Sequence, residues 1–381
     1  MSAHYWNLLR LILLASATLL LGACALFKPP QPGIGKVLSW DKVDDWQTDR
    51  HAEAWPALLH SCAALAKKAD WQQICQAATG IENPDDLLAR QFFEKWFTPH
   101  PVYGAGGKPT GLITGYYEPL LFGSFEPDQR FRYPLYGRPD SLLIIDLGDR
   151  FPELKNQRLR GRLVGDKVMP YFSRAEIDAD QTILEGNELL WLDDRDALFF
   201  LHIQGSGRVQ LPDGRVIGVG YADQNGHVYR SIGKILVERG ALALDEVTLF
   251  TIREWLRMHP EEAVELLGQN PSYVFFVLRE DPGQGPVGSM NVPLTPVRSI
   301  AIDPKLVSLG VPIWLSTHYP GNPDQPMKRL VFAQDTGGAI KGNVRADVFW
   351  GHDNNAEQAA GTMKSPGSLF VLLPRQHNLQ Q

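Results

Sequence analysis

Two aspartates near the C-terminal end of the chain are the residues best suited to chemistry. Asp335 and Asp347 lie on either side of a glycine-rich turn, in the segment AQDTGGAIKGNVRADVFWG that spans positions 333–351. An apolar, strand-like run precedes the first aspartate and another follows the second. A tight connection between these runs would bring both carboxyl groups into one partly desolvated pocket, where burial and a like charge raise a carboxyl pKa. The pattern therefore predicts a general acid, although Asp-Thr-Gly-Gly is also ordinary turn chemistry.

The motifs of metal, cofactor and nucleophile chemistry are missing from the sequence. There is no His-Glu-x-x-His and no Cys-x-x-Cys, and the histidines are scattered singly, so we expect no metal site. The glycine clusters at 283–288 and 337–342 lack the context of a phosphate-binding loop, so we expect no cofactor. The run 204–207, Gln-Gly-Ser-Gly, lacks the pattern of a nucleophile elbow, and we interpret it as a backbone-rich binding loop.

An aspartyl peptidase is one alternative. Asp335-Thr336-Gly337 after an apolar run is also how that family presents a catalytic carboxylate, and such a site needs a second aspartate on an equivalent motif. The chain has no second Asp-Thr-Gly, and Gln334 is polar where an apolar residue is expected.

Carbohydrate chemistry fits more of the sequence. The chain has 10 Trp and 11 Tyr, and aromatic faces stack on sugar rings while Gln, Ser and Asp bind hydroxyls. Most of these aromatic residues belong in a core. Tyr116 and Trp350 adjoin polar motifs, so we expect these two at a sugar site.

Composition and the N-terminal segment indicate the compartment. The chain has 381 residues, 44% of them hydrophobic, and a net charge of −6 without a basic stripe, so we expect two domains or one large one, and no nucleic-acid partner. After Arg10, an apolar run at 11–21 leads to Leu-Gly-Ala-Cys, which resembles a bacterial lipoprotein signal with Cys24 lipidated. The alternative is an uncleaved anchor, but the run is shorter than the roughly 20 residues of a bilayer span. The residue after Cys24 is not aspartate, which favours the outer membrane, and positions 28–33 form a stiff tether.

A helical pattern covers positions 44–97, where apolar residues recur at intervals of three and four. Cys62 and Cys75 lie thirteen positions apart on two of these helical patterns. In an oxidising compartment they predict a structural disulfide, and two buried free thiols are the alternative.

Strand signals dominate after Pro99. Positions 111–122 and 198–203 are predicted as strands, 209–217 as a hairpin and 223–229 as a turn. Three helices are then predicted, at 231–239, 247–258 and 261–267. Beyond 273–276, short strands separated by Pro and Gly run to position 373, which is typical of a small barrel.

Six segments are distinctive when taken together. They are GYYEP (115–119), LHIQGSGRVQLPDG (201–214), YADQNGHVYRSIGK (221–234), QNPSYVFF (269–276), VPLTPVRSIAID (292–303) and AQDTGGAIKGNVRADVFWG (333–351). In this order they resemble the membrane-bound lytic murein transglycosylase A family over about positions 115–374. The helical N-terminal part carries little of the resemblance.

The resemblance implies a mainly β fold with an α/β insertion. It implies a double-psi β-barrel domain with a helical N-terminal lead-in, a second mixed domain, and a substrate groove between them. We expect positions 1–23 to be the signal peptide and 24–43 the lipid anchor and tether. Positions 44–122 and 271–381 would form the discontinuous barrel domain, and 123–270 the inserted β-rich, substrate-binding domain.

The resemblance also implies an activity. Such enzymes cleave the β-1,4 bond between N-acetylmuramic acid and N-acetylglucosamine in peptidoglycan without water, and leave 1,6-anhydromuramic ends. The family's acid/base falls on Asp347 and its Asp-x-Gly-Gly aspartate on Asp335, which would tune Asp347 or orient the sugar. Arg345-Ala346 stands where some members have His-Phe.

The remaining candidate residues are expected along the glycan. We predict that Lys341 and Arg345 point along the groove toward peptide or lactyl carboxylates, because cations close to Asp347 would lower the pKa that an acid needs. The candidate substrate contacts are Tyr116, Tyr117, Gln204, Gly205, Ser206, Tyr229, Thr336, Lys341, Arg345 and Trp350.

Partners and rival functions follow from the same reasoning. The expected partners are peptidoglycan glycan strands and the outer membrane, through the lipid anchor on the periplasmic face. Partners from cell-wall synthesis or division complexes remain open. Besides the peptidase, the rivals are a peptidoglycan hydrolase with Asp335 as general base, and a wall-binding lipoprotein without catalysis.

Overall fold

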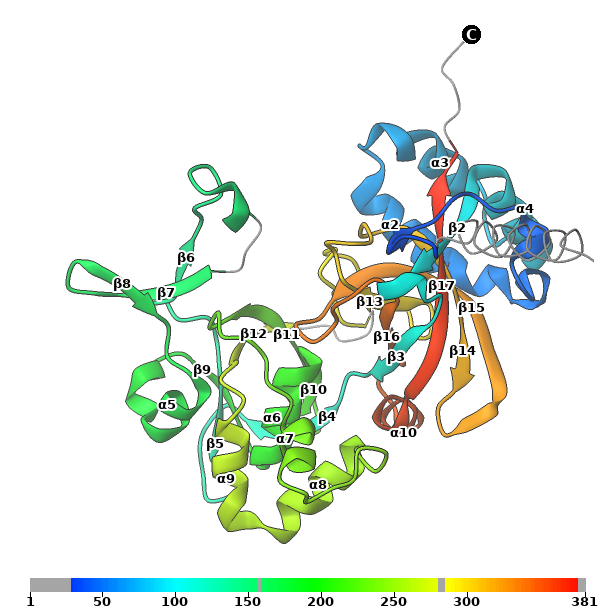
Figure 1. Cartoon of the computed structure of the whole chain (residues 1–381). Coiled ribbons are helices and arrows are strands. Elements are labelled where there is room, and N and C mark those ends of the chain that lie inside the picture. The colour runs from blue at the N-terminus through cyan, green and yellow to red at the C-terminus, as the bar shows by residue number, and fades with distance from the viewer. Residues whose placement is uncertain (1–28, 156–158, 280–284, 376–381) are drawn as a thin grey trace, which may run out of the picture.

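The computed structural model describes residues 29–155, 159–279 and 285–375, so the expected signal and Cys24 lie outside the described residues. The described chain is mainly β and forms two lobes joined where β3 runs on into β4 (Figure 1). Its strands make an eight-stranded, a six-stranded and a three-stranded sheet. No helix in the described part of the chain is long and apolar enough to cross a membrane.

A closed barrel forms the centre of the first lobe. Neighbouring strands pair in the order β17, β14, β15, β13, β16 and β3, and β3 pairs again with β17 to close the ring. The bounds are β3 Gly111–Tyr116, β13 Ser299–Ile302, β14 Pro312–Tyr319, β15 Asn322–Thr336, β16 Arg345–Phe349 and β17 Lys364–Pro374. Strands β2 (Phe97–Tyr103) and β1 (Gly33–Ile34) extend the sheet beyond β17. The prediction of a small barrel is confirmed, and closure removes the exposed edges of its six strands.

Helices cover part of the barrel. These are α2 (Trp55–Leu65), α3 (Ala69–Thr79) and α4 (Asp86–Trp96), preceded by short 3₁₀ turns at Trp40–Lys42, Trp46–Thr48 and His51–Ala54. Buried aromatic rings join the two layers: the ring of Phe93 on α4 lies 6.2 Å from that of Phe332 on β15. A disulfide between Cys62 and Cys75 links α2 to α3, with 5.3 Å between their Cα atoms.

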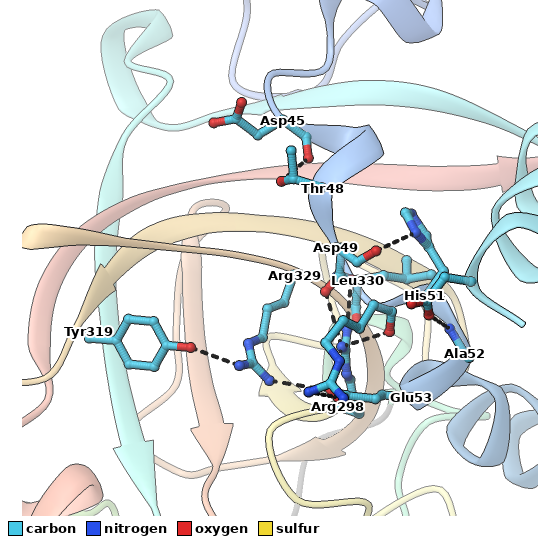
Figure 2. Close-up of polar contacts among 12 residues, drawn as sticks. Asp45, Thr48, Asp49, His51, Ala52, Glu53, Arg298, Tyr319, Arg329 and Leu330 are labelled. Carbon is cyan, nitrogen blue, oxygen red and sulfur yellow. Dashed lines mark hydrogen bonds and ion pairs between the residues drawn. The ribbon is translucent and has the colours of Figure 1, made fainter.

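One buried arginine fastens the N-terminal segment to the barrel (Figure 2). Arg298, immediately before β13, donates to Asp49 Oδ2 at 2.7 Å, to Asp49 Oδ1 at 3.0 Å and to Glu53 Oε2 at 2.9 Å. Asp49 Oδ2 also accepts from the backbone N–H of Leu330 on β15. The Arg298 and Asp49 side chains are 2% and 4% exposed, so they form a buried, bidentate ion pair.

The second lobe contains the six-stranded sheet. Its strands are β4 (Leu120–Ser124), β5 (Tyr133–Tyr136), β9 (Glu188–Leu192), β10 (Ser206–Gln210), β11 (Val216–Gln224) and β12 (Val274–Arg279). Strands β10 and β11 form the predicted hairpin, in which Gln210 pairs with Val216. The three helices predicted after it are present as α7 (Ile232–Glu238), α8 (Leu249–Met258) and α9 (Pro260–Gly268). Helix α5 (Arg174–Ala179) also belongs to this lobe, and strands β6 (Leu143–Ile145), β7 (Leu159–Val164) and β8 (Lys167–Pro170) project from it (Figure 1).

The prediction of a strand at 198–203 is wrong. These residues belong to helix α6, Arg195–Gln204. Asp194 caps the helix by accepting from the backbone N–H groups of Asp196 and Ala197, and Gly205 ends it with φ +78°. Five consecutive residues of this helix, Leu198 to His202, are buried, and such a continuous buried run cannot be told from a buried strand by its pattern.

Candidate active site

One row of residues runs across four strands of the barrel wall. Ala301 on β13 pairs with Asp335 on one side and with Asp347 on the other, and Asp347 pairs with Thr114 on β3. Residues that pair directly point to the same face of a sheet, so both aspartates and Thr114 share the outer face of the wall. Ala346 and Val348 alternate inward and are completely buried.

The glycine-rich turn does not bring the aspartates together by pairing their strands. Strand β13 lies between β15 and β16, so the two aspartates are two strand spacings, or roughly 10 Å, apart along the sheet. The two carboxyl groups nevertheless lie on one face of the wall, and the charge of Asp335 acts on Asp347. Between them stands Ala301, which is 3% exposed and belongs to a small buried cluster with Tyr116, Leu294, Ile340 and Phe349.

Asp347 has the environment of an acid. Its side chain is half-buried in the wall, and burial raises the pKa of its carboxyl group. The charge of Arg345 and a hydrogen bond from Thr114 lower that pKa, while the charge of Asp335 adds to the rise. Burial is the largest of these effects, so Asp347 keeps its proton to a higher pH than an ordinary aspartate.

Asp335 is held on both carboxyl oxygens. Tyr116 donates its hydroxyl to Oδ2 at 2.9 Å. On Oδ1 it accepts from the backbone N–H and the hydroxyl of Ser289, at 2.9 and 2.8 Å, and from the backbone N–H of Thr336 at 2.8 Å. Ser289 was not predicted, because it lies 46 residues before Asp335 with no recognisable motif. Asp335 is thus a fixed acceptor in the wall.

The predicted direction of Arg345 is wrong. Its guanidinium lies against the wall, where it donates to Thr114 Oγ1 at 2.9 Å and to the backbone carbonyls of Leu112 and Ala346. Lys341 is exposed on the loop between β15 and β16. Thr114 was missed as a site residue, since only the parallel pairing of β3 with β16, which no local motif records, brings it to Asp347.

Several predicted sugar contacts instead build the junction between the lobes. Tyr117 is buried, its backbone N–H donates to Gln204 Oε1 at 3.0 Å, and its hydroxyl donates to Glu357 on α10 (Asn354–Thr362) at 2.8 Å. Trp350 lies directly over Gly115, where an added Cβ would come within 2.6 Å of Trp350 Nε1. Both aromatic side chains therefore pack within the protein and are not open stacking platforms.

Most of the other predicted substrate contacts also have structural roles. Tyr116 is 7% exposed and supports Asp335, while Gly205 and Ser206 form the end of α6 and the start of β10. Thr336 shares a 2.7 Å hydrogen bond with the hydroxyl of Ser289 beside Asp335. Tyr229 comes from the second lobe, and a Cβ added to Gly338 would lie 3.9 Å from its Cβ. Tyr229 of the second lobe therefore lies close to the β15–β16 loop of the first.

Other candidate sites are weaker. No group of three or more metal-binding side chains is found in the described ranges. Two surface hollows of about 590 and 680 Å³ lie on the helical part, beside α2 and α3. None of the aspartates of the barrel wall lines either hollow.

Comparison with known proteins gives the family. Family models described as "MltA specific insert domain" and "3D domain" match residues 112–277 and 298–373. The membrane-bound lytic murein transglycosylase A of Escherichia coli K12 is 34% identical over 300 residues, 76% of this chain and 72% of that protein.

Solved structures agree. MltA from Neisseria gonorrhoeae is 35% identical, with a TM-score of 0.76 over 92% of this chain and 97% of that one. The structure of E. coli MltA with bound chitohexaose is 26% identical, with a TM-score of 0.67 over 91% and 96%. The shared architecture defines the chain as a peptidoglycan-cleaving enzyme of the lytic transglycosylase class. It belongs to the membrane-bound lytic murein transglycosylase A family.

Proposed function

We propose that this enzyme cleaves the β-1,4 bond between N-acetylmuramic acid and N-acetylglucosamine without water, with Asp347 as the single acid and base. The proposal is carried by the position of Asp347 on the same face of the wall as Asp335, where burial raises its pKa, while the protein holds Asp335 through hydrogen bonds to both carboxyl oxygens. A relative of the chain holds chitohexaose, a β-1,4-linked glycan, which supports a glycan strand as the substrate.

The reaction follows from one carboxyl group changing its protonation state twice. Protonated Asp347 donates its proton to the glycosidic oxygen, and the C1–O bond electrons leave with N-acetylglucosamine. The C6 hydroxyl oxygen of the muramoyl sugar then attacks C1, and its proton returns to the Asp347 carboxylate. The product is a 1,6-anhydro ring, no water is consumed, and Asp347 ends protonated as it began.

Asp335 is a poor candidate for a second catalytic group. Three donors hold Oδ1 of Asp335 and one holds Oδ2, so only Oδ2 keeps a lone pair for water, and hydrogen bonds to the carboxylate make it a weaker base. An aspartyl peptidase needs two carboxyl groups close enough to share a proton, whereas strand β13 separates these two. Asp335 serves instead to hold Tyr116 and to place a negative charge near Asp347.

The domain division and the membrane anchor also belong to this proposal. Residues 44–122 and 271–381 would form a barrel domain of the double-psi type, which the mixture of parallel and antiparallel pairs supports. Residues 123–270 would form the inserted domain, with the glycan in the groove between them. The relatives' description as membrane-bound supports a lipid anchor at Cys24 and an outer-membrane, periplasmic location.

The mass of the products of digested peptidoglycan tests the reaction. We expect anhydromuramic ends, which are one water lighter than the reducing ends that a hydrolase leaves. Asp347→Asn should reduce the rate by about 10²- to 10⁴-fold, the usual contribution of a general acid. Asp335→Asn keeps an acceptor oxygen and should lose much less.

Two outcomes would overturn the proposal. If the products carry only reducing ends, the enzyme is a hydrolase. If Asp347→Asn keeps full activity, Asp347 is not the catalytic acid. Chitohexaose binding by Asp347→Asn serves as the control that the groove is intact.

A further inference from the structure

The hydroxyl of Thr114 lies between a guanidinium and a carboxyl group. It contacts Asp347 Oδ1, and Arg345 Nη2 donates to it at 2.9 Å. Thr114 and Asp347 are paired residues of parallel strands, and Arg345 lies two positions before Asp347 on the same strand, so all three point to one face. No further hydrogen bond to the Asp347 carboxyl group is found in residues 29–155, 159–279 and 285–375.

The direction of these hydrogen bonds follows from counting protons. A guanidinium only donates, so Thr114 must use a lone pair toward Arg345. A hydroxyl carries one proton, and the only acceptor that Thr114 contacts among the described residues is Asp347 Oδ1. If Asp347 donated from Oδ1 instead, the Thr114 proton would be left without an acceptor, which is unfavourable in a half-buried site.

We propose that Thr114, oriented by Arg345, is a positioning residue that makes Oδ1 of Asp347 a permanent acceptor and confines the catalytic proton to Oδ2. The proposal rests on the acid/base role of Asp347 given above and names the atom that performs it. Oδ2 donates to the glycosidic oxygen and, as the free oxygen of the carboxylate, takes the proton of the C6 hydroxyl. Arg345 acts through Thr114 and leaves Oδ2 open.

The charged surroundings of Asp347 are few enough for a pH test. The ionisable groups that influence it are Arg345 on its own strand, Asp335 on β15 and Tyr116 on β3. Lys364 on β17 pairs with Thr114, but its ammonium group donates to the carbonyl of Leu244 in the second lobe. A change confined to Thr114 therefore leaves the other charges in place.

The test compares Thr114→Val, which has the same shape without a hydroxyl, with Thr114→Ser, which keeps the hydroxyl. Loss of a hydrogen bond to the carboxylate raises its pKa, so the alkaline limb of the kcat/KM profile should move up by about one pH unit in Thr114→Val. The value of kcat should fall about tenfold while KM stays the same, because orientation is lost but glycan binding is not. Thr114→Ser should restore both.

A second variant and a direct measurement keep the proposal testable if Thr114→Val does not fold. Arg345→Met removes both the donor that orients Thr114 and a positive charge near Asp347, so the alkaline limb should move up for either reason. Arg345→Lys keeps the charge but not the guanidinium fork, so a fall in kcat in this variant reports the lost orientation of Thr114. Carboxyl-carbon NMR of Asp347 in the free enzyme should report the same shift in its pKa.

An unchanged alkaline limb in folded Thr114→Val, or equal damage in Thr114→Ser, would overturn the positioning role. Failure of the proposed function looks different: Asp347→Asn would stay active, or the products would carry reducing ends.

Discussion

Asp347 destabilises the folded protein at neutral pH. Its folded pKa is raised above the ordinary value of 3.8, so ionising it costs more in the folded than in the unfolded chain. At low pH, where Asp347 is protonated in both the folded and the unfolded chain, it does not change the stability. The destabilisation appears as the pH rises from the pKa of the unfolded chain to the higher pKa of the folded chain.

We therefore expect Asp347→Asn to unfold at a higher temperature than the wild type at pH 7. The difference should narrow as the pH is lowered and vanish below the ordinary pKa of 3.8, where the wild-type carboxyl group is protonated in both the folded and the unfolded chain. Thermal unfolding at a series of pH values measures this. A difference that is absent at pH 7, or that grows on acidification, would contradict the burial of this group.

At the scale of elements, the ion pair of Arg298 fixes the strand that separates the two aspartates. Arg298→Met leaves the buried Asp49 carboxylate without its cation, and should reduce the free energy of unfolding by about 3–5 kcal/mol. Arg329→Met is the matched control. Its pair with Glu53 is 3.8 Å long, with side chains 25% and 38% exposed, and Arg329 also donates to the Tyr319 hydroxyl, so a loss of about 1 kcal/mol is expected. Urea unfolding measures both, and equal losses would show that burial of the pair is unimportant.

Local patterns in the sequence predicted the elements whose hydrogen bonds are local. The β10–β11 hairpin and helices α7, α8 and α9 carry their own turn and cap residues and were recognised. The strand Ser299–Ile302 between the aspartates, and the contact of Thr114 with Asp347, depend on pairing between distant segments, which local patterns do not record.

Two side chains show why residue polarity alone gave wrong predictions of the site. Gln334 counted against an aspartyl peptidase because an apolar residue is expected there, yet its side chain is fully buried and donates to the carbonyl of Ala57 and the hydroxyl of Ser61 on α2. Tyr117 adjoins a polar motif, yet its ring is part of the junction between the lobes. A polar neighbour in the sequence therefore did not distinguish a ligand contact from a satisfied core group.

At the scale of the whole molecule, one polar contact joins the two lobes at Glu357. Arg253 on α8 donates to Glu357 on α10 at 2.6 Å, and the same oxygen of Glu357 accepts from the Tyr117 hydroxyl. Both charged side chains are about one-third exposed, so the pair adds little to stability. Its effect should lie in the relative position of the lobes.

We expect Arg253→Met to raise KM for soluble glycan strands several-fold with little change in kcat. Without the ion pair, glycan binding must also fix the relative position of the two lobes, which costs binding free energy. The midpoint of thermal unfolding should hardly move. Arg257→Met is the control, because Arg257 lies one turn further along α8 and pairs only with Glu254 of its own helix among the described residues. A loss confined to kcat, or equal effects in both variants, would contradict a role in lobe position.

The closure of the barrel also sets an order of events during biogenesis. Strand β3 pairs with β16 and β17, and Thr114 meets Asp347 across 233 residues of chain, whereas the strands of the second lobe follow one another in the interval between them. Contacts between such distant segments form slowly, and a chain that emerges from its N-terminus offers β16 and β17 last. A copy that ends before β16 has no Asp347, and one that ends before β17 has an open wall beside Thr114. Under the proposed role of Asp347, such unfinished copies would lack the acid or the closed wall around it.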